Sequence, residues 1–133
     1  MSKIFTLSEA ASIAIHSMVL VARSPEGINV NQIAEFTGLS KNHIAKVMQQ
    51  LVKKDLLKSV RGPAGGFSLK RDPQTISMLD IYEMMEGPLE ESDCPLNYAV
   101  CNFDQCIFGN IVNEMTTGLK QYLSGQTLDK YMK

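Results

Sequence analysis

Two short helix patterns separated by a glycine turn constrain the fold of this chain more than any other feature. Asn29 is a good N-cap for a short amphipathic helix, and Gly38 ends that helix. Ser40 is suited to cap a second helix over residues 41–54. The apolar residues of the second helix recur at i, i+3, i+4 and i+7: Ile44, Val47, Met48 and Leu51. This arrangement predicts a helix-turn-helix unit.

A glycine-rich hairpin is expected directly after this unit. Two short β-prone runs between residues 56 and 71 flank the turn Gly62-Pro-Ala-Gly-Gly66. A hairpin in this position is interpreted as the wing of a winged helix. The paired glycines also raise the question of a phosphate-binding loop, but no G-K-[ST] follows them, which argues against a nucleotide site.

Three further helices are expected outside this central unit. The first spans residues 6–22, and another begins after Ser77, which forms a capping-box pattern with Asp80. The last spans residues 107–123 and carries an apolar stripe: Phe108, Ile111, Val112, Met115, Leu119 and Tyr122. A long amphipathic helix at the end of so small a domain favours dimerisation.

The predicted fold class is therefore mostly α with a small β-hairpin. We expect a winged helix-turn-helix DNA-binding domain over residues 1–88 and a cysteine-bearing loop over 89–106. A long dimerisation helix with a tail is expected over 107–133, which makes the chain a homodimer. No run of about 18 apolar residues occurs, so we expect no membrane partner.

Charge is distributed very unevenly, although the net charge is only −1. Between positions 41 and 71 a single acid, Asp55, faces eight basic residues: Lys41, Lys46, Lys53, Lys54, Lys58, Arg61, Lys70 and Arg71. From residue 72 to residue 119 the chain holds acids and no Lys or Arg. A basic segment inside a near-neutral chain is typical of nucleic-acid contact, although a solvated surface gives the same bias.

The residues expected to meet DNA come from the second helix and the hairpin tip. The N-terminal half of the helix carries Lys41, Asn42, His43 and Lys46, where base edges and phosphates are met. For His43, an ordinary surface histidine is an equally good interpretation. Arg61 at the hairpin tip is suited to a narrow minor groove.

All three cysteines lie within thirteen residues, at Cys94, Cys101 and Cys106. An odd number without pairing excludes a pure disulfide framework and favours a reducing compartment, so we expect a cytoplasmic protein. Thiolates select iron–sulfur clusters, zinc or copper(I), and the absence of a C-x2-C pair tilts mildly away from a zinc finger. A fourth ligand would have to come from elsewhere in the chain, from a partner subunit or from a small molecule. Bare redox-active thiols are the alternative.

The chain resembles the Rrf2-type bacterial winged-helix regulators, the group that includes IscR and NsrR. The resemblance rests on LSKNHIAKVMQQL (39–51), SVRGPAGGFSL (59–69), TISMLDI (75–81) and three cysteines followed by a helix. It implies a homodimer with crossing C-terminal helices that binds a palindromic double-stranded DNA operator. By this resemblance, Ser40 to Lys46 lie in the major groove, and Arg61, Gly62 and Pro63 reach the minor groove. It also implies an iron–sulfur cluster held by the three cysteines.

Two departures from the family pattern concern the cluster ligands. The cysteine gaps are six and four residues, where better-known members have five in each. Some members use a histidine three residues after the last cysteine, which here is Gly109, and others a carboxylate from the partner's first helix, which here is Ser12. Glu9 and His16 lie on the same helical stripe as Ser12, so either is a candidate fourth ligand, with His16 favoured.

These inferences together predict a DNA-binding transcriptional regulator, expected to be a repressor, and not an enzyme. Its operator affinity would be controlled by a 2Fe–2S or 4Fe–4S cluster that senses nitric oxide, redox state or iron–sulfur status. The alternative keeps the winged helix and uses the cysteines for thiol redox chemistry or structural zinc. A small cysteine enzyme is the remaining class, but no base at recognisable spacing accompanies the thiols.

Overall fold

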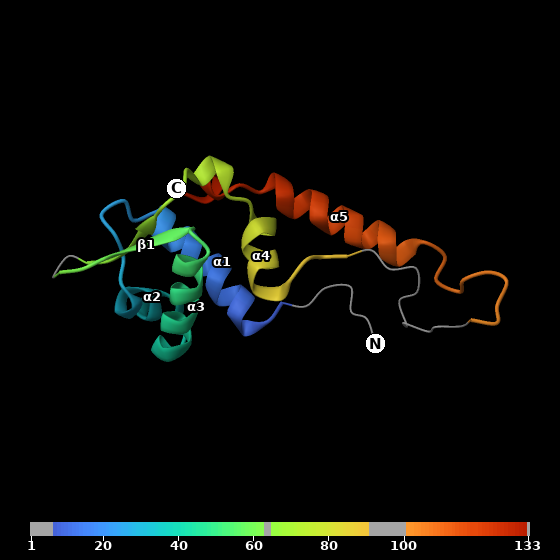
Figure 1. Cartoon of the computed structure of the whole chain (residues 1–133), viewed down its shortest axis with the longest axis horizontal. Helices are drawn as coiled ribbons and strands as arrows, with labels where there is room; N and C mark the ends of the chain where they lie inside the picture. Colours follow the sequence, from blue (N-terminus) through green and yellow to red (C-terminus); the bar gives the residue numbers. More distant parts are fainter. Residues whose placement is uncertain (1–6, 63–64, 91–100, 133) are drawn as a thin grey trace.

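The computed structural model describes residues 7–62, 65–90 and 101–132. Its elements, in chain order, are α1 (Glu9–Ala22), α2 (Val30–Thr37), α3 (Lys41–Lys53), β1 (Leu57–Val60), β2 (Gly66–Leu69), η1 (Pro73–Thr75), α4 (Met78–Glu86), α5 (Ile111–Gly125) and η2 (Leu128–Tyr131). The body of the molecule holds α1 to α4 and the hairpin, and α5 runs away from it (Figure 1).

The predicted helix caps set the ends of the short helices. Asn29 and Gln32 form a capping box at the start of α2, and Gly38 ends that helix in the left-handed conformation with φ of 74°. Ser77 and Asp80 form the second capping box, at the start of α4. Ser40 occupies the N-cap position of α3 as expected, but its hydroxyl makes no cap hydrogen bond.

The wing is a two-stranded antiparallel hairpin in which Leu57 pairs with Leu69 and Val60 with Gly66. Ile28 adds a short bridge to it, because Phe67 N–H donates to the Ile28 carbonyl at 2.7 Å. This bridge requires glycine at residue 66, since a Cβ there would lie 2.4 Å from the Ile28 carbonyl oxygen. The wing is thus fixed to the loop that precedes α2.

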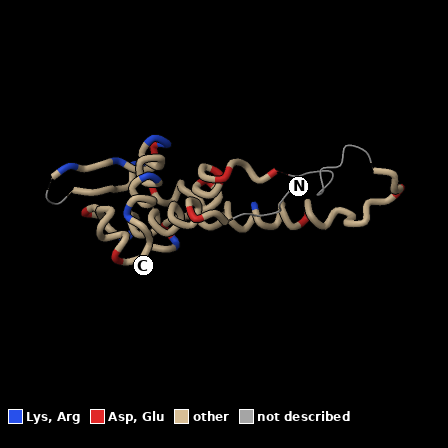
Figure 2. Tube along the Cα trace, turned by 90° about the horizontal axis from the view of Figure 1, so that it is seen from below, with Lys and Arg blue, Asp and Glu red and all other residues tan. Residues whose placement is uncertain are grey.

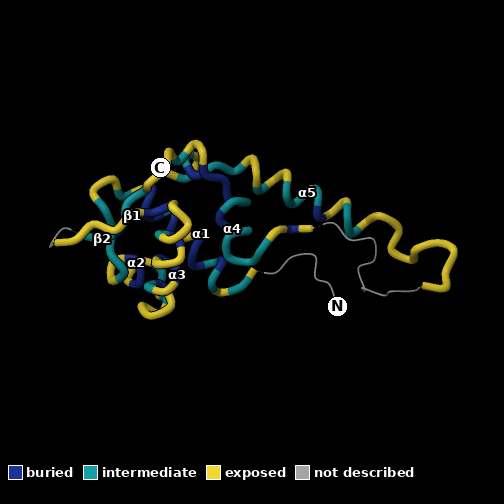
Figure 3. The backbone as a smooth tube through the Cα atoms, viewed as in Figure 1, coloured by how far each residue is buried: buried dark blue, intermediate teal, exposed yellow. Residues whose placement is uncertain are grey.

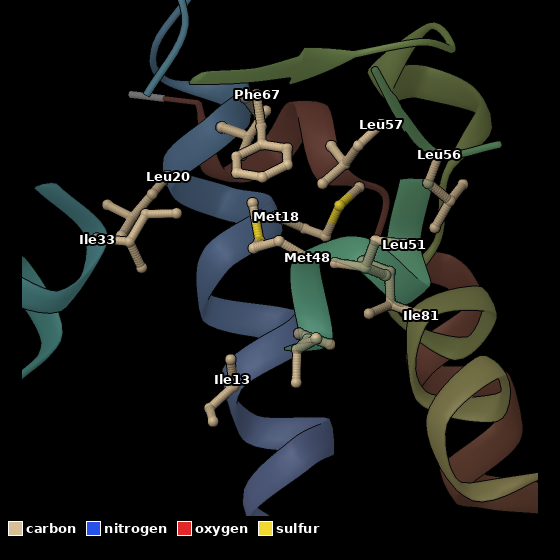
Figure 4. Close-up of a cluster of buried hydrophobic side chains, with 14 of the residues drawn as sticks. Ile13, Met18, Leu20, Ile33, Met48, Leu51, Leu56, Leu57, Phe67 and Ile81 are labelled. Atoms are coloured by element: carbon tan, nitrogen blue, oxygen red, sulfur yellow. The ribbon is translucent and has the colours of Figure 1, made fainter. Parts of the chain in front are cut away.

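The core forms where α1 passes between α3, α4 and the hairpin. Ile13 and Met18 of α1 are buried against Met48 and Leu51 of α3, and Ile81 of α4 joins the same cluster (Figure 4). The stripe predicted for α3 is buried as expected, while its opposite face is exposed. α3 is therefore held by its apolar face and leaves its polar face exposed.

The C-terminal part differs from the expectation in two ways. α5 begins at Ile111 and not at residue 107, because Gly109 adopts the left-handed conformation with φ of 59° and turns the chain first. The tail does not trail from α5. Instead, Leu128 is fully buried in the core, and its N–H donates to the Ile76 carbonyl at 2.9 Å.

The first half of α5 has almost no cover within the described residues. Thr116 is the helix's buried residue, while Leu119 and Leu123 pack on the small cluster of Ala11, Tyr82 and Leu89. Figure 3 shows exposed positions recurring along α5, in contrast to the buried α1. Among the described residues, the apolar contacts that anchor the helix thus come from its C-terminal half.

The burial of Leu128 gives a test of the tail's role. We expect Leu128→Ala to lower the free energy of unfolding by about 2–5 kcal/mol, because it opens a cavity in a closed core. Chemical denaturation followed by circular dichroism measures this change. Met132→Ala, at an exposed position of the same tail, serves as the control and should cost less than about 0.5 kcal/mol. Equal effects of the two variants would show that the tail does not contribute to the core.

Candidate nucleic-acid interface and cysteine turn

The exposed face of α3 presents every side chain that the sequence predicted for DNA contact on this helix. Ser40, Lys41, Asn42, His43 and Lys46 are all exposed. The helix N-terminus carries them, and the buried stripe on the opposite side holds it in place. The candidate interface therefore consists of cationic and amide side chains at the N-terminal end of α3, a helix whose opposite face is packed in the core.

The sequence also places Gln49 and Lys53 on this outer face, although they are not among the named DNA contacts. Gln49 and Lys53 are exposed and follow Asn42 and Lys46 at i+7 from each. Helical spacing predicts this placement, because residues seven apart share one side of a helix. The exposed stripe thus extends along the full length of α3.

The wing carries the second group of predicted contacts. Arg61 and Gly62 are exposed at the end of β1, and Gly62 has φ of 113°. Pro63 lies outside the described residues. Figure 2 shows Lys and Arg positions along the wing and on the adjacent helical body. Basic side chains are therefore exposed on both parts of the predicted interface, α3 and the wing.

The single acid of the basic segment is paired. Asp55 accepts a hydrogen bond from Lys70 Nζ at 2.9 Å. This hydrogen bond, together with the attraction of the lysine charge, lowers the pKa of the Asp55 carboxyl. Asp55 thus offsets the charge of Lys70 and leaves the lysines of α3 unaffected.

One further carboxylate reaches the DNA face from another helix. Glu9 Oε1 lies 3.0 Å from His43 Nδ1, and the side chains are 59% and 54% exposed. Glu9 is in the first turn of α1, so this contact joins α1 to the start of α3. The sequence reasoning had placed Glu9 at the cluster and His43 at the DNA, and it did not pair them.

His16, the other candidate ligand of α1, lies on the exposed side of that helix. Its Nδ1 is 2.7 Å from the Ser12 carbonyl oxygen, which accepts the Nδ1 hydrogen and leaves Nε2 as the available ring nitrogen. The ring lines a largely apolar pocket of about 410 Å³ with Val19, Arg23 and Phe36 among its neighbours.

The described cysteines lie on the turn that precedes α5. Cys101 and Cys106 are exposed free thiols, and Gly109 N–H donates to the Cys106 carbonyl at 3.1 Å. Cys94 lies outside the described residues. The turn is at the far end of α5, away from α1 in both views (Figures 1 and 2). Within one chain, the structure does not bring Glu9 or His16 to these thiols.

No cluster of three or more metal-binding side chains occurs among the residues that the structure describes. The donor chemistry of the turn suits a soft metal centre, because the thiols of Cys101 and Cys106, five positions apart in the chain, are accessible and unbonded. Within the same described ranges, no helix has the length and apolar character needed to cross a membrane.

Comparison with known proteins identifies the family. A family model described as Rrf2, iron-dependent transcriptional regulator, matches residues 7–133. The HTH-type transcriptional regulator NsrR of Bacillus subtilis is 30% identical over 122 residues, which cover 90% of this chain and 80% of that protein. The structure of T. potens IscR has a TM-score of 0.72 at 25% identity, covering 94% of this chain and 84% of that one.

A third similarity concerns the fold alone. CymR, described as the global cysteine regulator of B. subtilis, has a TM-score of 0.81 at 23% identity and 96% coverage of both chains. These likenesses confirm the predicted winged-helix fold. The family model and NsrR also confirm that the chain is a regulator and not an enzyme, because the matched family and relative are transcriptional regulators. The chain belongs to the Rrf2 family of transcriptional regulators.

Proposed function

We propose that this regulator is a homodimeric, cytoplasmic repressor whose operator affinity is controlled by an iron–sulfur cluster. The observation that carries the proposal is the confinement of all three cysteines to residues 94–106, with Cys101 and Cys106 exposed and unbonded. They lie directly ahead of α5, on which the apolar residues Ile111, Met115 and Tyr122 are exposed. The thiols and the dimer helix therefore belong to one structural unit.

The DNA-binding part of the proposal rests on the exposed basic residues of two elements, α3 and the wing. α3 presents Lys41, Asn42, His43 and Lys46 to a major groove, and the wing presents Arg61 to a minor groove. A twofold dimer would place two such units about 34 Å apart on one side of the duplex. We therefore expect a palindromic operator.

The dimer part of the proposal rests on the exposed side of α5. Ile111 and Met115 are each 49% exposed, and Tyr122 is 61% exposed, at spacings that share one helix face. The face continues into the turn through Phe108. A second copy of the same helix is the partner that buries this stripe most simply, because an isologous contact covers both stripes at once.

The cluster would be held by Cys94, Cys101 and Cys106, with one further ligand from the partner's α1. Glu9 is engaged by His43, whereas His16 keeps Nε2 available, so His16 is the favoured donor. When bound, the cluster supplies a centre that responds to redox state, nitric oxide or iron supply.

The chain's own residues would carry the coupling to DNA. A cluster that joins the cysteine turn of one subunit to α1 of the other would fix the relative orientation of the two winged-helix domains. Because each domain carries one α3, the cluster would also fix the distance between the two α3 helices. A coupling of about 1–3 kcal/mol would change operator affinity 5- to 150-fold.

A second candidate keeps the DNA interface and uses the thiols directly. The exposure of Cys101 and Cys106 favours it, because accessible thiols are open to oxidation or to structural zinc. Metal and sulfide analysis separates the two candidates.

The wing contact is tested by Arg61→Ala. We expect weaker operator binding and a salt dependence whose logarithmic slope is shallower by about 1, because one phosphate-region cation is removed. Fluorescence anisotropy at several salt concentrations measures both quantities. Lys120→Ala removes a cation from α5, away from the interface, and should change neither. Unchanged affinity and slope for Arg61→Ala would remove the wing from the interface.

The ligand assignment is tested by Cys101→Ser in anaerobically purified protein. We expect the visible absorbance, iron and acid-labile sulfide to be lost while the dimer stays folded, because one thiolate ligand is missing. Asp104→Asn alters the same turn without touching a thiol and should keep the full spectrum. A wild-type protein that stays colourless and iron-free after reconstitution would favour the thiol or zinc regulator.

The dimer face is tested by Met115→Glu, which places a charge in the apolar stripe. We expect a monomer by light scattering, with helix content retained, because a buried unpaired carboxylate is costly. Gln121→Glu adds the same charge on the exposed polar side of α5 and should leave the dimer intact. A dimeric Met115→Glu variant would place the interface elsewhere.

A further inference from the structure

The contact between Glu9 and His43 places an acid on a surface that is otherwise basic. An exposed carboxylate beside DNA phosphates weakens binding, because like charges repel. Glu9 therefore does not contribute to DNA affinity through its charge. Its contact partner suggests another role, since His43 lies among the residues proposed to read the operator.

The backbone at Glu9 is positioned by the contacts of its neighbour in the chain. The preceding residue, Ser8, caps α1 by accepting the Ala11 N–H at 3.1 Å. The same hydroxyl donates to the Glu86 carboxylate at the end of α4. The first turn of α1 is thus tied to α4 on one side and contacts α3 on the other, so the Glu9 backbone has a fixed place.

The chemistry of the pair fixes one state of the imidazole. With Nδ1–H donating to Glu9 Oε1 at 3.0 Å, Nε2 is the ring nitrogen left for another partner. A carboxylate in this position sets the tautomer and the plane of the ring, as carboxylates do for ligating histidines elsewhere. The ring stays 54% exposed, so Nε2 remains accessible.

The surroundings direct the ring toward the same surface as its neighbours. Glu9 and His43 line a shallow hollow of about 310 Å³ between α1 and α3, together with Lys46 and Gln50. Lys46 is one of the cations of the proposed interface. His43 therefore lies at the edge of the exposed α3 face that is nearest to α1. Without the contact to Glu9, its ring could take several orientations there.

We propose that Glu9 is a specificity-determining positioning residue. Its carboxylate holds the His43 ring in the orientation in which Nε2 contacts the edge of one base of the operator. The inference rests on the proposed DNA-binding function and gives Glu9 a role apart from metal ligation. It assigns the reading of one position of the operator to a residue pair from two helices, one of them outside the helix-turn-helix unit.

The test compares two DNA duplexes. The first is selected from a randomised pool by the wild-type protein, and the second is a scrambled duplex of the same length and composition. Affinities are measured for Glu9→Ala, Glu9→Gln, His43→Ala and the Glu9→Ala/His43→Ala double variant. Glu35→Ala, which removes an exposed acid from α2, is the control for charge alone.

We expect Glu9→Ala to lower the ratio of selected to scrambled affinity by about five- to tenfold, the lower end of what one base contact discriminates. Its affinity for the scrambled duplex should stay equal or rise, because a negative charge is lost. Glu9→Gln should recover most of the ratio, since its amide oxygen still accepts from Nδ1–H. In the His43→Ala background, Glu9→Ala should change the ratio by less than about twofold.

Four results would overturn the inference. An unchanged ratio for Glu9→Ala would show that Glu9 does not position the ring. The same loss of ratio with and without His43 would show that Glu9 acts through another group. Loss of bound iron in Glu9→Ala, measured on the same samples, would assign Glu9 to the metal site instead. If the wild-type protein selects no duplex at all, the proposed DNA-binding function fails along with the inference.

Discussion

The burial of α1 between α3 and α4 is the packing on which the rest of the molecule depends. Its small residues Ala11 and Ala14 are fully buried, which lets neighbouring helices approach closely, while Met18 fills the space beside α3. α3 is consequently supported along its whole apolar side, and α4 is fixed opposite. Because the wing is tied to the loop before α2 and η2 returns to the same core, one helix organises both the DNA face and the attachment of α5.

The structure could be predicted from the sequence wherever it depends on residues close together in the chain. Asn29 and Ser77 cap their helices as their side chains predict, and Gly38 ends α2 for the expected reason. The apolar stripe of α3 was predictable because helical spacing alone determines which residues share a face. The same argument correctly placed the polar residues of α3, from Lys41 to Lys53, on the exposed face.

Contacts between residues far apart in the chain were beyond this reasoning. The sequence placed Leu128 in the tail after the last helix, and its burial depends on its contact with Ile76. Glu9 and His43 are separated by 34 positions, and their pairing depends on how α1 crosses α3. The late start of α5 was closer to prediction, since Gly109 is a helix-stopping residue whose effect the apolar stripe concealed.

The attachment of α5 has a mechanical consequence. Its C-terminal end is clamped by Leu123 and by the return of the chain through Leu128, while its N-terminal end carries the cysteine turn. Fifteen helical residues span about 22 Å, so a tilt of about 5° at the clamp moves the turn by about 2 Å. In the proposed dimer, a force on the cysteine turn would therefore reach α4 and α1 through α5, and with them the elements proposed to face DNA.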